Sequence, residues 1–363
     1  SASPFSYNQE GARKAILLKN AGEYGVPIVY VNQVGAQTEL IFDGGSMMID
    51  RKGTVLHEMA YFEEDFKIID TQQPGRKQLQ ASKSSIEKIH DALLLGIRDY
   101  FAKTGFKTAT LGLSGGIDSA VVCALAVRAL GAQNVRVLLM PTKYSSDHSV
   151  ADAEALAENL GIRTDLINIQ KIVDEYDNAL SGIFEGLTPD VTEENIQART
   201  RGTLLMALSN KFGNILLNTS NKSECAVGYG TLYGDMNGGL AVIGDVYKTD
   251  VFRLARFINS EKEIIPENTI VKPPSAELRP DQKDSDSLPE YDVLDQILFR
   301  YIEMNLSPND IIAEGFETDT VRRAVRLVNM NEYKRFQAPP ILRVSSKAFG
   351  FGRRMPLVAK YQG

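Results

Sequence analysis

Residues 108–119 read TATLGLSGGIDS, and the fold class follows from this stretch and its neighbours. Thr108–Leu113 is a short run of apolar and β-branched residues, which predicts a buried strand. Ser114–Ser119 supplies two glycines for a tight turn, and an apolar helix is predicted from Asp118 to Leu130. A strand, a glycine turn and a helix N-terminus in this order predict a phosphate site, because unpaired N–H groups of a first helical turn attract anions.

The alternation of strands and helices continues along the chain. Further strands are predicted at Val135–Met140, Thr164–Ile169 and Ile215–Asn218. Further helices are predicted at Ser149–Leu160 and about Glu193–Phe212, and a capping box, Ser84-x-x-Glu87, begins another one before the first strand. Strands that alternate with helices favour right-handed crossovers, so we predict an α/β fold with a doubly wound parallel sheet. Its ligand is expected at the carboxyl ends of the strands.

Asp118 is the unusual residue of the glycine turn, since a carboxylate beside phosphates is repulsive unless a cation lies between them. Magnesium fits this position, because it binds one or two carboxylates together with phosphate oxygens. The alternative is a plain tight turn in which Asp118 caps the helix. The chain has no G-x-x-x-x-G-K-[ST] pattern, so the usual loop for γ-phosphate transfer is excluded.

The composition excludes several classes of protein. The 363 residues carry 40 basic and 46 acidic side chains, and a formal charge of −6 argues against a dedicated nucleic-acid binder. Apolar residues make up 43%, which is typical of a globular protein. Neither a transmembrane segment nor a signal peptide is visible. Cys123 and Cys225 are too few for a disulfide framework, so a reducing compartment, the cytoplasm, is expected.

Polar residues also follow the later elements. Arg199 and Arg201 lie in the long predicted helix and, being two residues apart, at most one of them is expected to face a ligand. Thr219 and Glu224 follow the last predicted strand, so they project at the ligand edge of the sheet, where Glu224 could bind a second magnesium. Lys248 precedes an apolar helix and, taken alone, would be a surface lysine.

The motif S-G-G-x-D-S at residues 114–119 resembles the pyrophosphate loop of the ATP pyrophosphatase superfamily, whose fold is adenine nucleotide alpha hydrolase-like. The further motifs N-x-x-A-R at 195–199, T-x-x-x-x-E at 219–224 and Y-G-D at 233–235, followed by Lys248, are similar to those of NAD synthetase. The likeness continues through Lys272–Leu278 and Asn331–Arg335, so it covers essentially all of residues 84–363.

This resemblance implies roles for individual residues. ATP would be bound by Ser114, Gly115, Gly116, Asp118, Ser119, Met140, Thr219, Lys248 and Ser275. Asp118 and Glu224 would bind Mg²⁺ and would form the catalytic group with Lys248. Arg199 and Lys334 would bind deamido-NAD, which is nicotinic acid adenine dinucleotide. Two other deamido-NAD contacts of the family, a lysine and an aspartate, fall on Leu232 and Gly239 and cannot be carried over.

The implied reaction is the ATP-dependent amidation of deamido-NAD to NAD through an acyl-adenylate, with release of AMP and pyrophosphate. The family also implies a homodimer or a larger homo-oligomer, with no nucleic-acid or membrane partner. One alternative is another adenylating ligase of the superfamily, such as a tRNA-modifying enzyme, although the cysteines are not paired in sequence and the net charge is negative. A non-catalytic ATP-binding module is a further alternative, against which Asp118, Glu224, Arg199 and Lys248 all argue.

The first 75 residues contain one predicted helix, Gly11–Ala21, and a few short β-type runs, with a polar linker at Asp70–Ser85. These elements are too few to close a core alone, so we expect part of a domain. The chain begins with serine, and Ser3–Phe5, Tyr30–Gly35 and Phe42–Ser46 resemble the closing strands of the nitrilase-type glutaminase domain found in glutamine-dependent NAD synthetases.

The expected organisation is therefore a C-terminal remnant of a glutaminase domain at residues 1–75 and a synthetase domain at residues 76–363. The glutamate, lysine and cysteine of a nitrilase-type glutaminase lie upstream of the segment that resembles Ser3–Phe5. We therefore expect this chain to take ammonia as nitrogen donor and to lack glutaminase activity, and the intact parent to take glutamine. Lys272–Pro289 contains four prolines and little apolar content, which favours a lid over the site, with plain disorder as the alternative.

Overall fold

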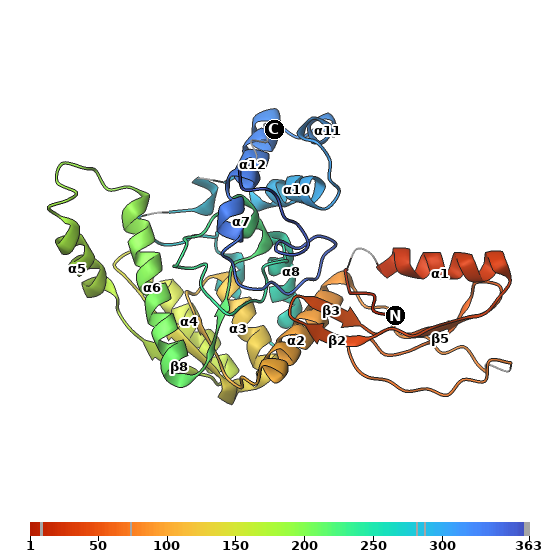
Figure 1. Ribbon diagram of the computed structural model, residues 1–363. Coiled ribbons are helices and arrows are strands. Elements are labelled where there is room, and N and C mark those ends of the chain that lie inside the picture. Colours follow the sequence, from red (N-terminus) through yellow and green to blue (C-terminus); the bar gives the residue numbers. More distant parts are fainter. Residues whose placement is uncertain (8–9, 73–74, 281, 287, 359–363) are drawn as a thin grey trace.

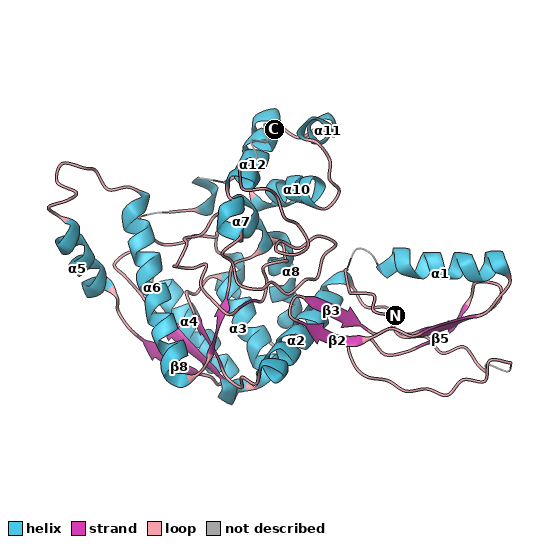
Figure 2. Ribbon diagram, viewed as in Figure 1, coloured by secondary structure: helices cyan, strands magenta, loops and turns pink. Residues whose placement is uncertain are grey.

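The computed structural model describes residues 1–7, 10–72, 75–280, 282–286 and 288–358. Its centre is a parallel sheet of five strands in the order β10-β9-β6-β7-β8 (Figures 1 and 2). The strands are β6 (Ala109–Gly112), β7 (Val135–Leu139), β8 (Arg163–Leu166), β9 (Ile215–Asn218) and β10 (Leu240–Ala241). The predicted α/β fold with a parallel sheet is confirmed, although the short strand β10 was not predicted.

The strand order places a crevice between β6 and β9. From β6 the chain proceeds through β7 to β8 on one side of the sheet, and then returns to β9 and β10 on the other side. Such a reversal separates the loops that leave the carboxyl ends of two neighbouring strands, which is where open α/β sheets bind ligands. The glycine turn follows β6, and Thr219 follows β9, so both lie at this point.

Helices cover both faces of the sheet (Figure 1). On one face α2 (Ser85–Thr104), α3 (Ile117–Leu130) and α8 (Lys248–Ile258) pack together in the largest core. The other face packs against α5 (Gln170–Leu180) and α6 (Val191–Phe212). The remaining two helices of this layer, α4 (Asp147–Leu160) and α9 (Glu267–Val271), contact α3. Within the described ranges no helix is both long enough and apolar enough to cross a membrane.

Several element ends differ from the predictions for local reasons. The strand predicted at Thr164–Ile169 ends at Leu166, because Ile169 is the N-cap of α5, a helix that was not predicted. The helix predicted from Ser149 begins at Asp147, since the Ser146 side chain accepts a hydrogen bond from the Ser149 N–H and caps it.

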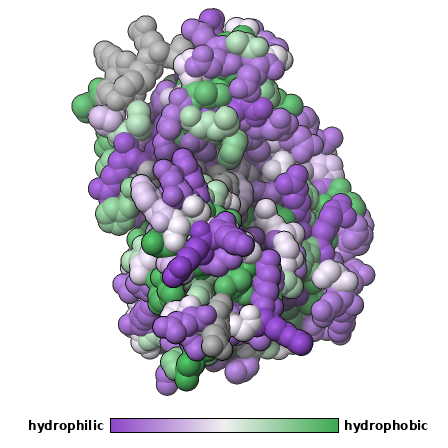
Figure 3. All heavy atoms as spheres, turned by 90° about the vertical axis from the view of Figure 1, so that its right-hand side faces the viewer, coloured by the Kyte–Doolittle hydropathy of each residue, from purple (hydrophilic) through white to green (hydrophobic). Residues whose placement is uncertain are grey.

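The N-terminal part projects from the sheet domain (Figure 1). Its helix α1 (Glu10–Tyr24) packs on an antiparallel sheet of β1 (Ile28–Tyr30), β4 (Met47–Ile49) and β5 (Val55–Glu58) around a small separate core. A hairpin of β2 (Val34–Gln37) and β3 (Leu40–Asp43) packs instead on α2, and Phe5, Ala36 and Ile41 belong to the largest core. On the face shown in Figure 3, apolar side chains occur in separate patches among polar ones.

A helical layer lies against the sheet domain, toward the top of Figure 1. It consists of α7 (Lys222–Val227), α10 (Tyr291–Ile302), α11 (Pro308–Ala313), α12 (Thr318–Met330) and α13 (Glu332–Arg335). A second core joins α7, α10, α11 and α12. At the start of α7 the fully buried Lys222 forms ion pairs with Asp245 and Glu303, each at 2.9 Å, and donates a hydrogen bond to the Ser345 hydroxyl at 2.7 Å.

We expect Lys222→Met to lower the free energy of unfolding by about 3–5 kcal/mol, because it leaves the buried carboxylates of Asp245 and Glu303 without their cation. Chemical denaturation of the full chain measures this change. The exposed Lys262 provides the control, and Lys262→Met should change the free energy of unfolding by no more than about 0.5 kcal/mol. Equal stability of the two variants would show that the buried ion pairs do not hold the layer in place.

Candidate active site

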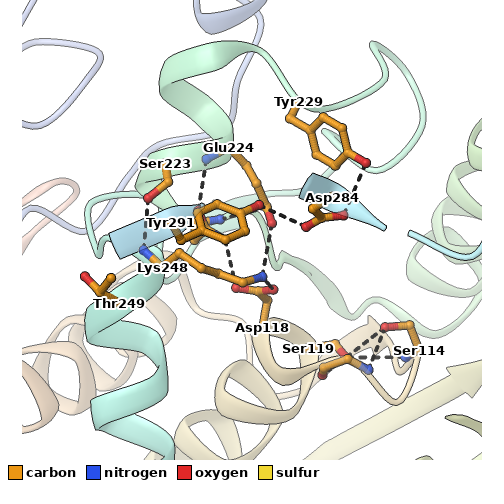
Figure 4. Close-up of polar contacts among 12 residues, drawn as sticks. Ser114, Asp118, Ser119, Ser223, Glu224, Tyr229, Lys248, Thr249, Asp284 and Tyr291 are labelled. Carbon is orange, nitrogen blue, oxygen red and sulfur yellow. Dashed lines mark hydrogen bonds and ion pairs between the residues drawn. The ribbon is translucent and has the colours of Figure 1, made fainter. Parts of the chain in front are cut away.

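The glycine turn between β6 and α3 has the geometry of an anion site. Gly115 has a φ of +78°, and a Cβ atom there would lie 2.1 Å from the backbone oxygen of Ser149, so only glycine fits. Gly116 is the N-cap of α3 and no side chain caps this helix, which leaves the N–H groups of its first turn for a ligand. Ser114 and Ser119 place their hydroxyl oxygens 3.2 Å apart beside the turn (Figure 4). Asp118 is not the cap of α3, so the plain capped turn is excluded.

Lys248 lies between Asp118 and Glu224 (Figure 4). Its ammonium forms an ion pair with Asp118, and its Nζ lies 3.4 Å from Oε1 of Glu224. The Lys248 side chain is only 3% exposed, against 18% for Asp118 and 16% for Glu224. Lys248, which on its own would be expected at the surface, is therefore buried, because two carboxylates from α3 and α7 balance its charge.

The electrostatics of this cluster shift two pKa values. Burial opposes the charge of Lys248, but Asp118 and Glu224 outweigh burial and raise its pKa above the usual value. Burial, together with the charge of Asp118, raises the pKa of Glu224 to about 8, although Lys248 acts in the opposite direction. The two carboxylates therefore repel each other, and a cation between them relieves that repulsion.

The donor set fits magnesium, which prefers carboxylate and phosphate oxygens. The side chains of Asp118 and Glu224 are 18% and 16% exposed, so a further cation can reach their oxygens beside the ammonium of Lys248. Among the described residues, no group of three or more His, Cys, Asp or Glu side chains could hold a metal ion. A metal ion at Asp118 and Glu224 would therefore complete its shell with water or nucleotide oxygens.

Two cavities meet at the glycine turn. The first, of about 250 Å³, is lined by apolar side chains that include Leu138 and Met140 at the end of β7 and Leu205 of α6. The second, of about 210 Å³, is lined by charged side chains, including Asp118, Glu224, Lys248 and Lys272. Both cavities share Ser114, Ser119 and Thr219 as lining residues. An apolar cavity that opens into a charged one suits a nucleotide, with its base in the first and its phosphates in the second.

The structure brings the residues predicted to bind ATP to these two cavities. Met140 lines the first cavity, and Ser114, Ser119 and Thr219 line both. Gly116, Asp118, Lys248 and Ser275 line the second cavity, with Gly115 in the turn beside them. The Ser275 hydroxyl donates a hydrogen bond to the carbonyl of Gln282, so it also holds its own segment together.

One of the two arginines on α6 faces the first cavity, and it is Arg201. Its Nε donates a hydrogen bond to the carbonyl of Met140 at 3.1 Å, and burial lowers its pKa to about 10. Arg199 is exposed and does not line either cavity, and its Nε donates to the carbonyl of Leu232 at 3.2 Å. The prediction that at most one of them faces the ligand agrees with these cavities, and the role of Arg199 in binding deamido-NAD stays a prediction.

The segment from Lys272 to Asp286 lies over both cavities. Its Ala276 and Glu277 line both of them, and the Glu277 carboxylate accepts hydrogen bonds from the hydroxyls of Ser146 and Ser149, at 2.9 and 2.8 Å. Lys272 forms an ion pair with Asp152 at 3.0 Å. This position agrees with the predicted lid; residues 281 and 287 lie outside the described part of the chain.

Lys334 belongs to α13 and borders a third cavity that Glu224 also lines. It donates hydrogen bonds to the carbonyls of Gly228 and Gly230, both at 2.8 Å, and this third cavity is small, about 20 Å³. Burial lowers the pKa of Lys334. Its predicted contact with deamido-NAD is not tested by this geometry and stays a prediction.

Sequence reasoning missed Asn221, Asp284 and Tyr291. The fully buried Asn221 donates from Nδ2 to Asp118 at 2.9 Å, and its backbone N–H donates to Oε2 of Glu224 at 3.3 Å, so it contacts both carboxylates. An asparagine three residues before a glutamate is a capping-box signal that could have revealed it. Asp284 lines the second cavity and accepts a hydrogen bond from the Tyr291 hydroxyl at 2.9 Å, and the Tyr291 ring centroid lies 5.3 Å from Lys248 Nζ.

Comparison with known families shows to which family this chain belongs. Residues 89–338 match the family model described as NAD synthase. The chain belongs to the NAD synthase family. It is 50% identical to the glutamine-dependent NAD(+) synthetase of Synechocystis sp. over 366 residues, which cover 99% of this chain and 66% of that protein.

Solved structures show the same relationship. The glutamine-dependent NAD+ synthetase of Acinetobacter baumannii, solved in complex with adenosine diphosphate, is 44% identical, with a TM-score of 0.72 over 98% of this chain and 66% of that one. The NH3-dependent NAD synthetase of Campylobacter jejuni is 30% identical, with a TM-score of 0.56 over 71% of this chain and 99% of that one. The chain thus spans about two thirds of the length of the glutamine-dependent relatives.

The glycine turn makes a first prediction. We expect Gly115→Ala to weaken ATP binding at least tenfold, because its Cβ would displace the turn from the backbone of Ser149. Gly186→Ala is a matched control: Gly186 has a φ of +79°, and a Cβ there would meet nothing within 4 Å. It carries the same backbone strain and should leave ATP affinity unchanged. Isothermal titration calorimetry of ATP measures both variants, and equal affinities would exclude the turn as the phosphate site.

The raised pKa of Glu224 makes a second prediction. The folded protein holds this proton more tightly than the unfolded chain, with a pKa of about 8 against 4.5, so Glu224 makes the free energy of unfolding fall as pH rises between these values. Chemical denaturation at pH 5.5 and 8 should show a smaller decrease for Glu224→Gln than for the unsubstituted chain. Glu154→Gln, at an exposed site on α4, should retain the full decrease. Identical decreases in all three proteins would contradict the raised pKa.

Proposed function

We propose that this chain catalyses the ATP-dependent amidation of deamido-NAD to NAD through an acyl-adenylate, with release of AMP and pyrophosphate. The observation that carries the proposal is the cluster of Asp118, Glu224 and Lys248 at the junction of an apolar and a charged cavity. Two further findings support this proposal: the chain belongs to the NAD synthase family, and the Acinetobacter baumannii relative was solved in complex with ADP.

Adenylation is needed because a free carboxylate is a poor acceptor for an amine. In the first step, a carboxylate oxygen of the nicotinate attacks the α-phosphorus of ATP, the bond between the α-phosphorus and its bridging oxygen breaks, and pyrophosphate leaves. In the second step, ammonia attacks the acyl carbon and AMP leaves with the electron pair, while the nitrogen loses a proton. The protein contributes mainly position and charge neutralisation to both steps.

Each residue of the site has its own role in binding the substrates. N–H groups of the first turn of α3, which follows Gly116, would bind phosphate oxygens together with the hydroxyls of Ser114 and Ser119, and Lys248 would neutralise the charge that develops on pyrophosphate. Asp118 and Glu224 would hold Mg²⁺, which supplies further neutralisation of the phosphate oxygens. Met140 and Thr219 border the space for the nucleoside. Arg199 and Lys334 would contact deamido-NAD.

The segment from Lys272 to Asp286 would protect the acyl-adenylate. It already lies over both cavities through Glu277 and Lys272. Exclusion of water from the closed site would favour attack by ammonia over hydrolysis. Ser275 of this segment lines the charged cavity, where it would contact the ATP phosphates.

The nitrogen donor of this chain would be ammonia, and that of an intact parent would be glutamine. Residues 1–75 would be the closing part of a nitrilase-type glutaminase domain and residues 76–363 the synthetase domain. The Synechocystis relative is named as glutamine-dependent and the Campylobacter jejuni enzyme as NH3-dependent. Both nitrogen donors are therefore used by proteins that this chain resembles. The working form would be a homodimer or a larger homo-oligomer in the cytoplasm.

The test is NAD formation by the full chain with ATP, Mg²⁺ and deamido-NAD, with either ammonium or glutamine as nitrogen donor. We expect NAD and one equivalent of AMP with ammonium, and no NAD with glutamine. Nicotinic acid mononucleotide serves as a second acceptor, since a Francisella tularensis structure of 26% identity is described as an NMN synthetase. Amidation of the mononucleotide alone would contradict deamido-NAD as the substrate.

Asp118→Asn should abolish NAD formation while the protein stays folded, because the metal loses a charged ligand and Lys248 loses an ion-pair partner. Asp147→Asn, at an exposed position on α4, is the control and should keep the activity. Full activity of Asp118→Asn would exclude the proposed magnesium site.

A further inference from the structure

Asp295 belongs to the helical layer, yet it reaches the two helices that carry the site. It lies on α10 and is 5% exposed. Its Oδ1 accepts a hydrogen bond from the hydroxyl of Ser223, and its Oδ2 accepts one from the backbone N–H of Thr249 at 2.9 Å. Ser223 directly precedes Glu224, and Thr249 directly follows Lys248. One carboxylate therefore binds the neighbours of two site residues.

The N-terminus of α8 depends on these contacts. Its N-cap residue, Tyr247, makes no side-chain cap, so the first N–H groups of the helix need partners from elsewhere. The N–H of Lys248 donates to the Ser223 hydroxyl at 2.9 Å (Figure 4). The N–H of Thr249 donates to Asp295. Thus Ser223 and Asp295 together form a cap supplied by two other helices.

We propose that Asp295, acting through Ser223, is a positioning residue that sets the distance between Glu224 and Lys248 for catalysis. The proposal rests on the proposed function. It follows from the small size of α7, because a helix of six residues is too short to hold its own position and takes it from tertiary contacts. The hydroxyl of Ser223 joins α7 to the backbone of α8, and the carboxylate of Asp295 fixes that hydroxyl in place.

A second residue of α10 acts on the same lysine. Tyr291 precedes Asp295 by four residues, so both side chains lie on one face of the helix. The Tyr291 ring centroid lies 5.3 Å from Lys248 Nζ, while Asp295 and Ser223 hold the backbone at residues 248 and 249. The same face of α10 therefore orients both the backbone and the ammonium of Lys248.

The first test is Asp295→Asn, which keeps the size of the side chain but turns one acceptor into a donor that faces an N–H or a hydroxyl. We measure kcat and the KM for deamido-NAD at saturating ATP and ammonium, with thermal unfolding as a check on folding. We expect kcat per folded protein to fall about 10–100-fold, the size typical for groups that orient metal ligands, with KM within about threefold. Asp292→Asn, at an exposed site on the same helix, should keep both values.

The second test is a double-mutant cycle with Ser223→Ala, which also covers the case in which Asp295→Asn fails to fold. Ser223→Ala alone should lower kcat, and because both residues act through one hydrogen bond, the double variant should lose less than the product of the two single losses. Multiplicative losses, or an unchanged kcat in Asp295→Asn with only a lower unfolding temperature, would overturn the proposal and leave Asp295 a structural residue.

A third measurement distinguishes failure of the proposed function from failure of the positioning role of Asp295. If the unsubstituted chain forms no NAD, the proposed function fails, and calorimetry of ATP binding with and without Mg²⁺ still tests the positioning role. We expect Mg²⁺ to strengthen ATP binding less in Asp295→Asn than in Asp292→Asn, because Asp295 sets the distance between Glu224 and Lys248. An equal strengthening by Mg²⁺ in both variants would overturn the proposal.

Discussion

The ammonium of Lys248 between the carboxylates of Asp118 and Glu224 is the interaction on which the site depends. The three residues lie on three helices and are brought together by charge in a place largely shielded from water. Burial and the negative charge of Asp118 raise the pKa of Glu224, and the ammonium of Lys248 opposes that rise. Any chemistry on phosphates at this site therefore has to preserve the same balance of charge.

The parallel sheet explains how these groups can meet. β6 and β9 are neighbours although more than a hundred residues separate them, and the chain leaves both at the same edge of the sheet. The turn after β6 leads to Asp118, and the loop after β9 leads to Glu224. Lys248 approaches from α8, which packs beside α3 and α2 on one face of the sheet. The apolar cavity lies on the other side of this edge, between the strand ends and α6.

The sequence predicted those parts of the site that follow directly from strand ends. The glycine turn, Thr219 and Glu224 could be placed because a strand pattern precedes each of them and fixes the edge at which they emerge. The orientation of α6 could not be predicted, since its apolar residues do not form one clear stripe, and the arginine in the cavity is Arg201. The burial of Lys248 and the contributions of α10 depend on contacts between segments far apart in sequence, for which no local pattern exists.

The short helix α7 shows why the remaining layers are needed. Each of four consecutive residues at its start has its own partner in a different part of the molecule: Asn221 binds Asp118, Lys222 binds Asp245 and Glu303, Ser223 binds Asp295, and Glu224 approaches Lys248. Contacts in several directions restrict both the translation and the rotation of a helix that could not form alone. A carboxylate that must keep its distance from a lysine and from phosphates is thereby held by the sheet domain and the helical layer together. The helical layer is therefore part of the site's geometry, although few of its side chains line the cavities.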